Sequence, residues 1–171
     1  MIKTERLSLR LIQAGDWKAI QKIWADQAAS GYAGFDKPND LDDAAVSERI
    51  AMWASFAGGA EHIFYAVCLE ETVIGYVAFN RRPEGYEIGY CFHSDYHGRG
   101  YAKESISVLL DLMKEKGVPV ITAGTALGNI PSVRLLLSLG FKQAGTEKLS
   151  FYKDEDGRDI IFEGGIFELR F

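Results

Sequence analysis

A glycine-rich segment near the middle of the chain could bind a phosphate group. Gly98 and Gly100 lie between an apolar run that ends at Phe92 and an amphipathic segment that begins near Tyr101. Because glycine has no Cβ, the backbone can turn tightly there and a ligand can approach its amides closely. The first N–H groups of a helix have no partner inside the helix and lie at the positive end of its dipole. A strand, a glycine turn and a helix N-terminus in succession therefore predict a phosphate cradle.

Two common phosphate-binding loops do not match this segment. A Walker loop ends in Gly-Lys-Ser/Thr, and the chain contains no such sequence. A Rossmann fingerprint needs a third glycine three residues after Gly100, where this chain has Lys103. By itself, the segment also fits a plain turn that joins a strand to a core helix.

Further motifs place the loop in a family context. His97-x-x-Gly-x-Ala102 resembles the (Gln/Arg)-x-x-Gly-x-(Gly/Ala) loop with which GNAT N-acetyltransferases bind the pyrophosphate of acetyl-CoA. The segments 129–132 (Asn-Ile-Pro-Ser) and 139–141 (Leu-Gly-Phe) resemble a second family motif, and segment 5–10 is similar to the branch that includes ribosomal-protein N-terminal acetyltransferases. The resemblance covers nearly the whole chain and is most specific over 87–141. The first residue of the loop departs from the pattern, because the family has Gln or Arg there.

The resemblance implies that acetyl-CoA is the co-substrate and that no metal is needed. One backbone N–H group within Tyr90, Cys91 and Phe92, where the two parallel strands of the family part, is expected to bind the thioester oxygen, and full pairing of the strands is the alternative. The amide of Asn129 is expected to bond the pantetheine arm, and capping of the next helix is its alternative role. The other expected cofactor contacts come from the loop and the two following helices: His97, Gly98, Arg99, Gly100, Tyr101, Ala102, Lys103, Ser132 and Arg134.

Transfer of an acetyl group from a thioester to an amine needs a base and a mild acid. Deprotonation at pH 7 costs about 4.6 kcal/mol for a lysine side chain and about 1 kcal/mol for an α-amino group, so an N-terminal amine is the easier acceptor. Glu87 is the first candidate base, and a solvent-facing carboxylate paired with Arg81 or Arg82 is the alternative. Ser132 and Tyr152 are the candidate proton donors to the coenzyme thiolate, although Tyr152 is equally typical of a strand aromatic that packs on the core.

Cys91 offers a different mechanism, through an acyl-cysteine intermediate. No histidine is placed by the sequence to activate it, because His93 would point to the other face of an extended strand. We therefore interpret Cys91 as a small buried apolar residue.

The acceptor of the acetyl group is a primary amine on a small molecule or a peptide. Tyr32, Phe35, Trp53 and Phe56 could line its pocket, because the substrate groove of the family borders the first two helices, but ordinary packing fits them as well. Two other classes remain open: a catalytically silent acyl-CoA-binding sensor, which would keep the cradle, and a nucleotide-binding domain without acyl chemistry.

Composition excludes several other functions. The chain has 24 acidic and 19 basic residues, for a net charge of −5, so nucleic acid is not an expected partner. It has no run of about 18 apolar residues and no signal-peptide pattern at Met1, so we expect a cytoplasmic protein with no membrane span. Its two cysteines are too few for a disulfide scaffold or a zinc site.

The elements that must position these residues follow from hydrophobic periodicity and turn signals. We expect strands at 7–11, 63–69, 72–79, 86–92, 120–125, 141–152 and 158–171, and helices that begin near Asp16, Asp42, Ala102 and Pro131. A strand–helix–strand unit makes the strands at 86–92 and 120–125 parallel. The fold class is therefore α/β: one domain over 1–171, with a mixed, mostly antiparallel sheet of about seven strands, a splayed parallel pair and about four helices. The two closing strands, 141–152 and 158–171, could form the interface of a homodimer.

The last strand carries an irregular apolar pattern. Ile160 and Phe162 share one parity, whereas Phe167, Leu169 and Phe171 have the other. One extra residue at Gly164-Gly165 would bring all five to one face, so we predict a β-bulge there.

Overall fold

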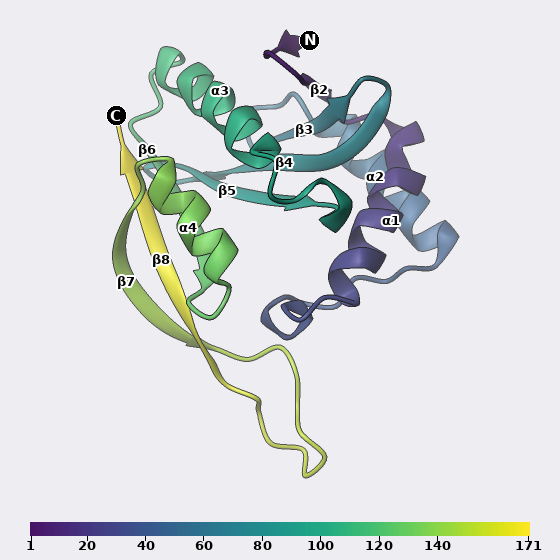
Figure 1. The fold of residues 1–171 in the computed structure, drawn as a ribbon, viewed down its shortest axis with the longest axis vertical. Coiled ribbons are helices and arrows are strands. Elements are labelled where there is room, and N and C mark those ends of the chain that lie inside the picture. Colours follow the sequence, from purple (N-terminus) through teal and green to yellow (C-terminus); the bar gives the residue numbers. More distant parts are fainter.

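One sheet runs through the molecule, and helices pack against both of its faces (Figure 1). The computed structural model describes all residues from 1 to 171. In spatial order its strands are β1 (Ile2–Lys3), β2 (Ser8–Leu11), β3 (His62–Leu69), β4 (Thr72–Arg82), β5 (Gly85–Phe92), β6 (Val120–Ala126), β8 (Phe162–Arg170) and β7 (Lys142–Leu149). Every neighbouring pair is antiparallel except β5 and β6. The predicted fold class is confirmed, with eight strands because the two-residue β1 adds one.

The four α-helices begin at residues that suit helix starts. They are α1 (Trp17–Ala28), α2 (Asp43–Phe56), α3 (Tyr101–Glu115) and α4 (Ile130–Ser138). The Asp42 carboxylate accepts hydrogen bonds from the second and third residues of α2, and the side chain of Asn129 accepts one from the Ser132 amide in α4. No helix has both the length and the apolar character that crossing a membrane would require.

Asp16 precedes α1, as expected, but its side chain does not cap that helix. Its carboxylate instead accepts two hydrogen bonds from Arg10, at 2.7 and 2.8 Å, and one from the Gln13 amide at 2.8 Å. Aspartate is favoured as a helix cap and a cap would be expected of Asp16, but none forms on α1, because the guanidinium offers a paired donor that a single helix amide cannot match.

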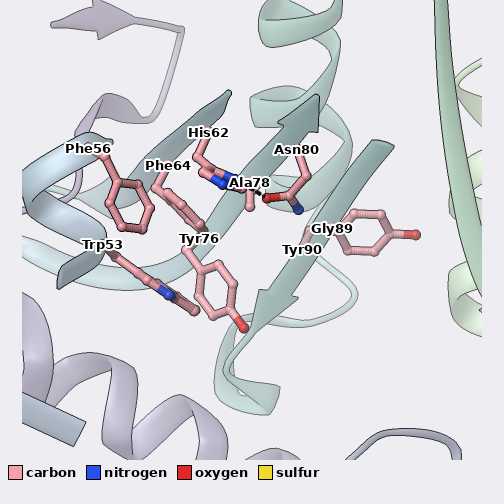
Figure 2. Close-up of a pocket in the computed structure, with 9 residues that line it drawn as sticks. All are labelled: Trp53, Phe56, His62, Phe64, Tyr76, Ala78, Asn80, Gly89 and Tyr90. Carbon is pink, nitrogen blue, oxygen red and sulfur yellow. Dashed lines mark hydrogen bonds between the residues drawn. The ribbon is translucent and has the colours of Figure 1, made fainter. Parts of the chain in front are cut away.

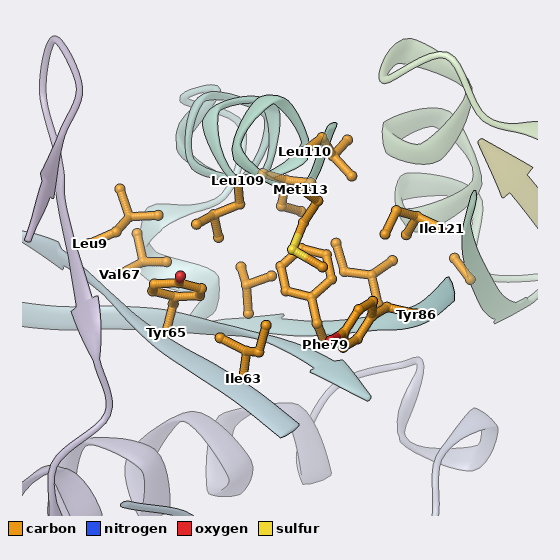
Figure 3. Packing of buried hydrophobic residues seen from close by; sticks show 14 of the residues in the cluster. Leu9, Ile63, Tyr65, Val67, Phe79, Tyr86, Leu109, Leu110, Met113 and Ile121 are labelled. Atoms are coloured by element: carbon orange, nitrogen blue, oxygen red, sulfur yellow. The ribbon is translucent and has the colours of Figure 1, made fainter. Parts of the chain in front are cut away.

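Two apolar cores flank the sheet. On one face, Leu109 and Met113 of α3 and Leu136 of α4 share a core (Figure 3) with alternate strand residues, which include Leu9, Ile63, Val67, Phe79, Ile88 and Phe167. On the other face, Ile20 and Trp24 of α1 and Val46 and Ile50 of α2 share a core with the intervening strand residues, which include Phe64 and Ala78. Because side chains alternate along a strand, β3 and β4 contribute residues to both cores. β5 pairs with β4 and therefore lies in a sheet that is packed on both faces.

The predicted bulge at Gly164-Gly165 is wrong. β8 stays paired with β6 through both glycines, and it also stays paired there with β7. The register shift lies instead on the partner strand, between Gln143 and Gly145 of β7.

Close packing explains the two glycines. A Cβ built on Gly165 would lie 2.6 Å from both Leu127 Cδ2 and Phe167 Cε2, and a Cβ on Gly164 would lie 3.0 Å from Leu149 Cδ1. A larger residue at either position would collide with apolar side chains, so the glycines provide space and not a bend.

The two closing strands are shorter than the sequence pattern indicates. β7 and β8 were expected at 141–152 and 158–171, but residues 150–161 form a connection that extends away from the sheet (Figure 1). Tyr152 lies in this connection and not on a strand, and Ile160 is 51% exposed. Apolar residues continue to alternate in the sequence beyond Leu149 and before Phe162, where the strands are no longer paired. The sequence pattern therefore does not show where the pairing of β7 with β8 ends.

Candidate active site

The two parallel strands part before they reach the glycine turn. β5 pairs with β6 only at Tyr86 with Ile121 and at Glu87 with Thr122, whereas β6 is paired with β8 over its whole length. The part of β5 from 88 to 92 therefore has no partner on the β6 side. This splayed pair was predicted, and it leaves a gap between the two strands.

Two backbone N–H groups of β5 face this gap. The His93 amide donates to the carbonyl of Ile74 on β4 at 3.0 Å. Because alternate residues of an antiparallel strand face the same neighbour, the Cys91 amide also faces β4, and the amides of Tyr90 and Phe92 face the gap. Of the three residues that could supply the one expected donor, Tyr90 and Phe92 have amides that face the gap, and the Cys91 amide faces β4.

The glycine turn presents open backbone at the start of α3. Gly98 and Gly100 have φ of +71° and +80°, a region that side-chain-bearing residues rarely adopt. A Cβ at Gly98 would meet no atom within 4 Å, and at Gly100 the nearest atom, on the Arg6 guanidinium, is 3.4 Å away. Arg99 and Lys103 are exposed beside the turn, so backbone amides and cationic side chains are both accessible to an anion.

His97, where the family pattern has Gln or Arg, bonds to the protein backbone. Its Nε2 lies 2.8 Å from the Phe92 carbonyl oxygen, so the ring connects the end of β5 to the turn. The turn is also tied to α1, because Asp26 accepts hydrogen bonds from the amide and hydroxyl of Ser94. Although burial alone would raise it, these bonds and the nearby His93 and His97 rings lower the pKa of Asp26.

An N-terminal cluster braces the same turn and was missed by the sequence reasoning. The Arg6 guanidinium donates to the Arg99 carbonyl at 2.9 Å, pairs with Glu104 at 2.7 Å and lies 4.6 Å from the centre of the Tyr101 ring. Thr4 donates to the same Glu104 carboxylate at 2.5 Å. The N-terminal motif was used only as part of a family resemblance, whereas its side chains hold the glycine turn in place.

Three hydroxyl groups meet between β5, β6 and α4. The Tyr90 hydroxyl lies 2.8 Å from Ser132 Oγ, and Thr125 donates to the same oxygen at 2.9 Å. Burial raises the pKa of Tyr90, so its hydroxyl stays protonated near neutral pH. The Asn129 carbonyl oxygen caps α4, which leaves its NH2 group free to donate, and Arg134 is exposed on the same helix.

Tyr152 stands apart from this hydroxyl cluster in the hydrogen-bond pattern. Its carbonyl accepts bonds from the Ser150 hydroxyl and the Ile160 amide, and its own hydroxyl makes no hydrogen bond within the chain. The tyrosine that contacts Ser132 is Tyr90, which sequence reasoning had considered only for its backbone.

Glu87 lies on the α1–α2 face of β5 and is paired with Arg82. This is the alternative that the sequence left open for the carboxylate. Its side chain is 38% exposed, and it lies two residues before Gly89 on the same face of the strand. One carboxylate oxygen accepts from Arg82, and the other is free.

The Cys91 thiol is unsuited to covalent catalysis. Burial, together with the negative charges of Asp36 and Asp26, raises its pKa to about 12. It packs against the core under α1 and α2, as expected of a small apolar residue. A thiolate is the reactive form of cysteine, so this environment keeps the group inert near neutral pH.

A cavity of about 440 Å³ opens on the α1–α2 face beside the gap (Figure 2). It is lined by Trp53, Phe56, His62, Phe64, Tyr76, Ala78, Asn80, Gly89 and Tyr90. A Cβ at Gly89 would meet no atom within 4 Å, so this glycine leaves open space at the edge of β5. In Figure 2 the Tyr90 ring points away from the aromatic group, toward the opposite side of the strand.

Two of the four aromatic residues proposed for an acceptor pocket line this cavity, namely Trp53 and Phe56. Phe35 instead packs on Phe162, with ring centres 5.2 Å apart, and Tyr32 is exposed on the α1–α2 connection. Both cavity residues come from α2, and the sequence could not separate residues that line a cavity from residues that pack on a loop.

The cavity also contains a polar pair that the sequence did not reveal. His62 of β3 and Asn80 of β4 are cross-strand partners, and His62 Nδ1 lies 2.9 Å from Asn80 Oδ1. With the Asn80 oxygen accepting, Nδ1 carries the proton and Nε2 is left as an acceptor. Only the register of two strands brings these residues together, so no local motif could have shown the pair.

The comparisons with known proteins agree with this geometry. The family model described as "Acetyltransferase (GNAT) domain" matches residues 6–142. The chain therefore belongs to the GNAT acetyltransferases: it is an N-acetyltransferase that uses acetyl-CoA as co-substrate and acts on amines. A curated relative, the uncharacterized N-acetyltransferase p20 of Bacillus licheniformis, is 29% identical over 161 residues, covering 92% of this chain and 89% of the relative.

Solved structures share the fold at lower sequence identity. The ribosomal-protein-S5-alanine acetyltransferase of Vibrio fischeri has a TM-score of 0.81 at 20% identity, covering 99% of this chain and 95% of that chain. The Microcin C7 self immunity acetyltransferase MccE, in complex with acetyl-CoA and AMP, has a TM-score of 0.81 at 14% identity, covering 98% and 94%. These likenesses support the fold of the whole chain.

Proposed function

We propose that this enzyme acetylates a primary amine by direct attack on acetyl-CoA, with both substrates bound at once. The observation that carries the proposal is the position of the gap between β5 and β6. It meets the glycine turn on the α3 side, and it meets the cavity at Gly89 on the α1–α2 side. A thioester in the gap can therefore be reached by an amine from the opposite face of the sheet.

The cofactor fits the accessible donors around the gap. The diphosphate binds the backbone amides of the turn and the first residues of α3, 98–102, with Arg99 and Lys103 beside it. The pantetheine arm enters the gap and accepts a hydrogen bond from the free NH2 group of Asn129. Arg134, exposed on α4, meets the remaining phosphate.

The reaction then needs three placements. The amine nitrogen attacks the thioester carbon, and the oxygen that becomes negative is bound by the N–H groups of Tyr90 and Phe92. Glu87 takes the proton that the amine must lose, directly or through a water molecule. As the carbon–sulfur bond breaks, the leaving thiolate takes a proton through the Ser132 hydroxyl, which regains one from water; the modest basicity of the thiolate makes a strong acid unnecessary. Tyr152, with no hydrogen-bond partner for its hydroxyl, is the rival proton donor.

Peptide and small-molecule amines both suit this arrangement. The structural neighbour from Vibrio fischeri is named for an alanine of a ribosomal protein. A protein N-terminus carries an amine that is easily deprotonated at neutral pH, which supports it as one acceptor class. Small monoamines, whose cost of deprotonation is higher, depend more strongly on the base.

Initial-rate kinetics test direct attack. With acetyl-CoA and an active amine varied together, a ternary complex gives intersecting double-reciprocal lines, whereas an acyl-enzyme gives parallel lines. Mass spectrometry of the enzyme after exposure to acetyl-CoA alone should show no acetylated Cys91. Parallel lines with a stoichiometric adduct would contradict the proposal, and binding of acetyl-CoA without CoA release across a wide amine panel would identify a silent acyl-CoA sensor.

A further inference from the structure

The cavity beside the gap is apolar and has no charged walls. Of its nine lining residues, six are hydrophobic, and none has a carboxylate, ammonium or guanidinium group. A buried cation is costly unless a carboxylate or several hydrogen bonds compensate it. A polyamine or an aminoglycoside would bring several ammonium groups into this cavity, where no lining residue pairs with them and the Glu87 carboxylate beside Gly89 is a partner for one at most.

The aromatic walls contact one another and leave little room for a cation on their faces. Trp53 stacks on Phe64 with ring centres 4.6 Å apart, and the Arg49 guanidinium lies 5.5 Å from the centre of the Trp53 indole. Phe56 tilts toward Phe64 at 5.9 Å. The aromatic side chains therefore expose their ring edges to the cavity, where a flat apolar group can pack. The cation–π position over the Trp53 indole is already occupied by Arg49.

The floor of the cavity leads to the point of transfer. Ala78 and Gly89 are cross-strand partners, and both are small. A ligand that lies on them has its end at the edge of β5, beside the amides that face the gap. A cavity of about 440 Å³ has room for a body of one or two rings, since small-ligand pockets span roughly 300–1,000 Å³.

We propose that this cavity selects a monoamine whose nitrogen is joined by a short apolar linker to a flat aromatic body. The His62–Asn80 pair, at the end of the cavity away from Trp53, supplies an acceptor and a donor for a polar group on the far end of that body. The shared chemistry is the phenethylamine skeleton, which occurs in free arylalkylamines and in an N-terminal aromatic residue. This inference rests on the proposed function and names its acceptor class.

A panel of amines on the wild-type enzyme tests the inference. Phenethylamine, the dipeptide amide Phe-Ala, the dipeptide amide Ser-Ala and spermidine are compared by release of free CoA. The two aromatic acceptors should exceed the other two in kcat/KM by at least tenfold, and the better of the aromatic pair identifies the source. Equal values, or a preference for spermidine, would overturn the inference.

A cavity-filling variant tests the location. In Gly89→Leu the new side chain enters open space, because nothing lies within 4 Å of its Cβ. The preference for the aromatic acceptors should fall at least tenfold while acetyl-CoA affinity, measured by calorimetry, stays within about threefold of the wild-type value. An unchanged preference in a variant that still binds acetyl-CoA would place the aromatic body elsewhere.

A second variant protects the test against a folding defect in the first. Phe56 is partly exposed at the end of α2, so Phe56→Asp adds a carboxylate to the wall at a tolerant position. It should weaken phenethylamine and strengthen spermidine, which reverses their order. An unchanged order would contradict the role assigned to this wall.

Binding separates the inference from the function on which it rests. Calorimetry of phenethylamine and spermidine against the enzyme–CoA complex ranks the two amines without turnover. If no amine releases CoA, the proposed function fails, and the binding order still decides the acceptor class.

Discussion

Ser132 is the hydroxyl with the best-defined surroundings in the gap. Thr125 donates to its oxygen, and Tyr90 lies within hydrogen-bond distance on the other side. Because burial raises the pKa of Tyr90, that phenol stays an O–H donor across the working range of pH. With Thr125 donating to its oxygen, Ser132 keeps its own proton to donate, either to the Tyr90 oxygen or to a group in the gap.

Ser132→Ala should therefore lower kcat by about 10² or less, because loss of a proton donor to a modestly basic thiolate costs less than loss of a strong acid. Thr125→Val is the matched control, since it removes a donor to Ser132 but leaves the Ser132 proton in place. Its kcat should fall by less than about tenfold. Equal losses in both variants would show that the cluster is structural.

Glu87→Gln should lower kcat/KM for the best acceptor by about 10² and flatten the acidic limb of its pH profile, because the amide cannot take up a proton. Arg82→Gln removes the ion-pair partner and keeps the carboxylate, so the limb should persist. A profile of unchanged shape in Glu87→Gln would remove Glu87 from the mechanism.

Elements built from local patterns were predictable, and contacts between distant elements were not. The β5 strand, the glycine turn and α3 were indicated by a short stretch of sequence, since periodicity and glycine chemistry act locally. The brace of Arg6 on Glu104 spans 98 residues, and the His62–Asn80 pair depends on strand register. The glycines of β8 were misinterpreted because glycine occurs both where a strand needs space for its neighbours and where a strand bends. The sequence does not distinguish the two cases.

The brace between the N-terminal segment and α3 should make stability depend on pH. Although burial alone would raise it, hydrogen bonds from Thr4 and Arg6 lower the pKa of Glu104 below its ordinary value of 4.5. A carboxylate whose pKa is lower in the folded chain than in the unfolded chain stabilises the fold at pH values above the unfolded pKa. This contribution is lost as the pH falls through the pKa of the folded chain.

Glu104→Gln should accordingly reduce the free energy of unfolding by about 1–2 kcal/mol at pH 7, discounted for the partial exposure of Arg6. The difference from wild type should begin to shrink as the pH falls below the ordinary pKa of 4.5, and it should vanish only below the lowered pKa of the folded chain, where Glu104 is protonated in both states. Denaturant unfolding at pH 7 and at pH 3.5 measures it. A difference of the same size at both values would exclude the ion pair as its cause.

The packing account of β8 predicts a contrast between two glycines. Gly165→Ala should cost about 1–3 kcal/mol of stability, because its Cβ would lie 2.6 Å from Leu127 and Phe167. Gly124→Ala, on the neighbouring β6, meets nothing within 4 Å and should change stability by less than about 0.5 kcal/mol. Similar thermal midpoints for the two variants would contradict the packing explanation.

The layered architecture gives the two substrates separate routes to one point. Helices α3 and α4 pack on one face of the sheet and α1 and α2 on the other, so the gap in β5–β6 is the passage between them. The cradle, the freed amides and the Ser132 hydroxyl approach this passage from the α3 side. The apolar cavity approaches it from the α1–α2 side, as the proposed direct transfer requires.

A crystal structure of the enzyme with CoA bound tests this arrangement most directly. We expect the diphosphate on the amides of residues 98–102 and the pantetheine arm between β5 and β6, with its sulfur beside the amides of Tyr90 and Phe92. CoA bound elsewhere, or strands β5 and β6 paired as far as Phe92 in the complex, would contradict the account.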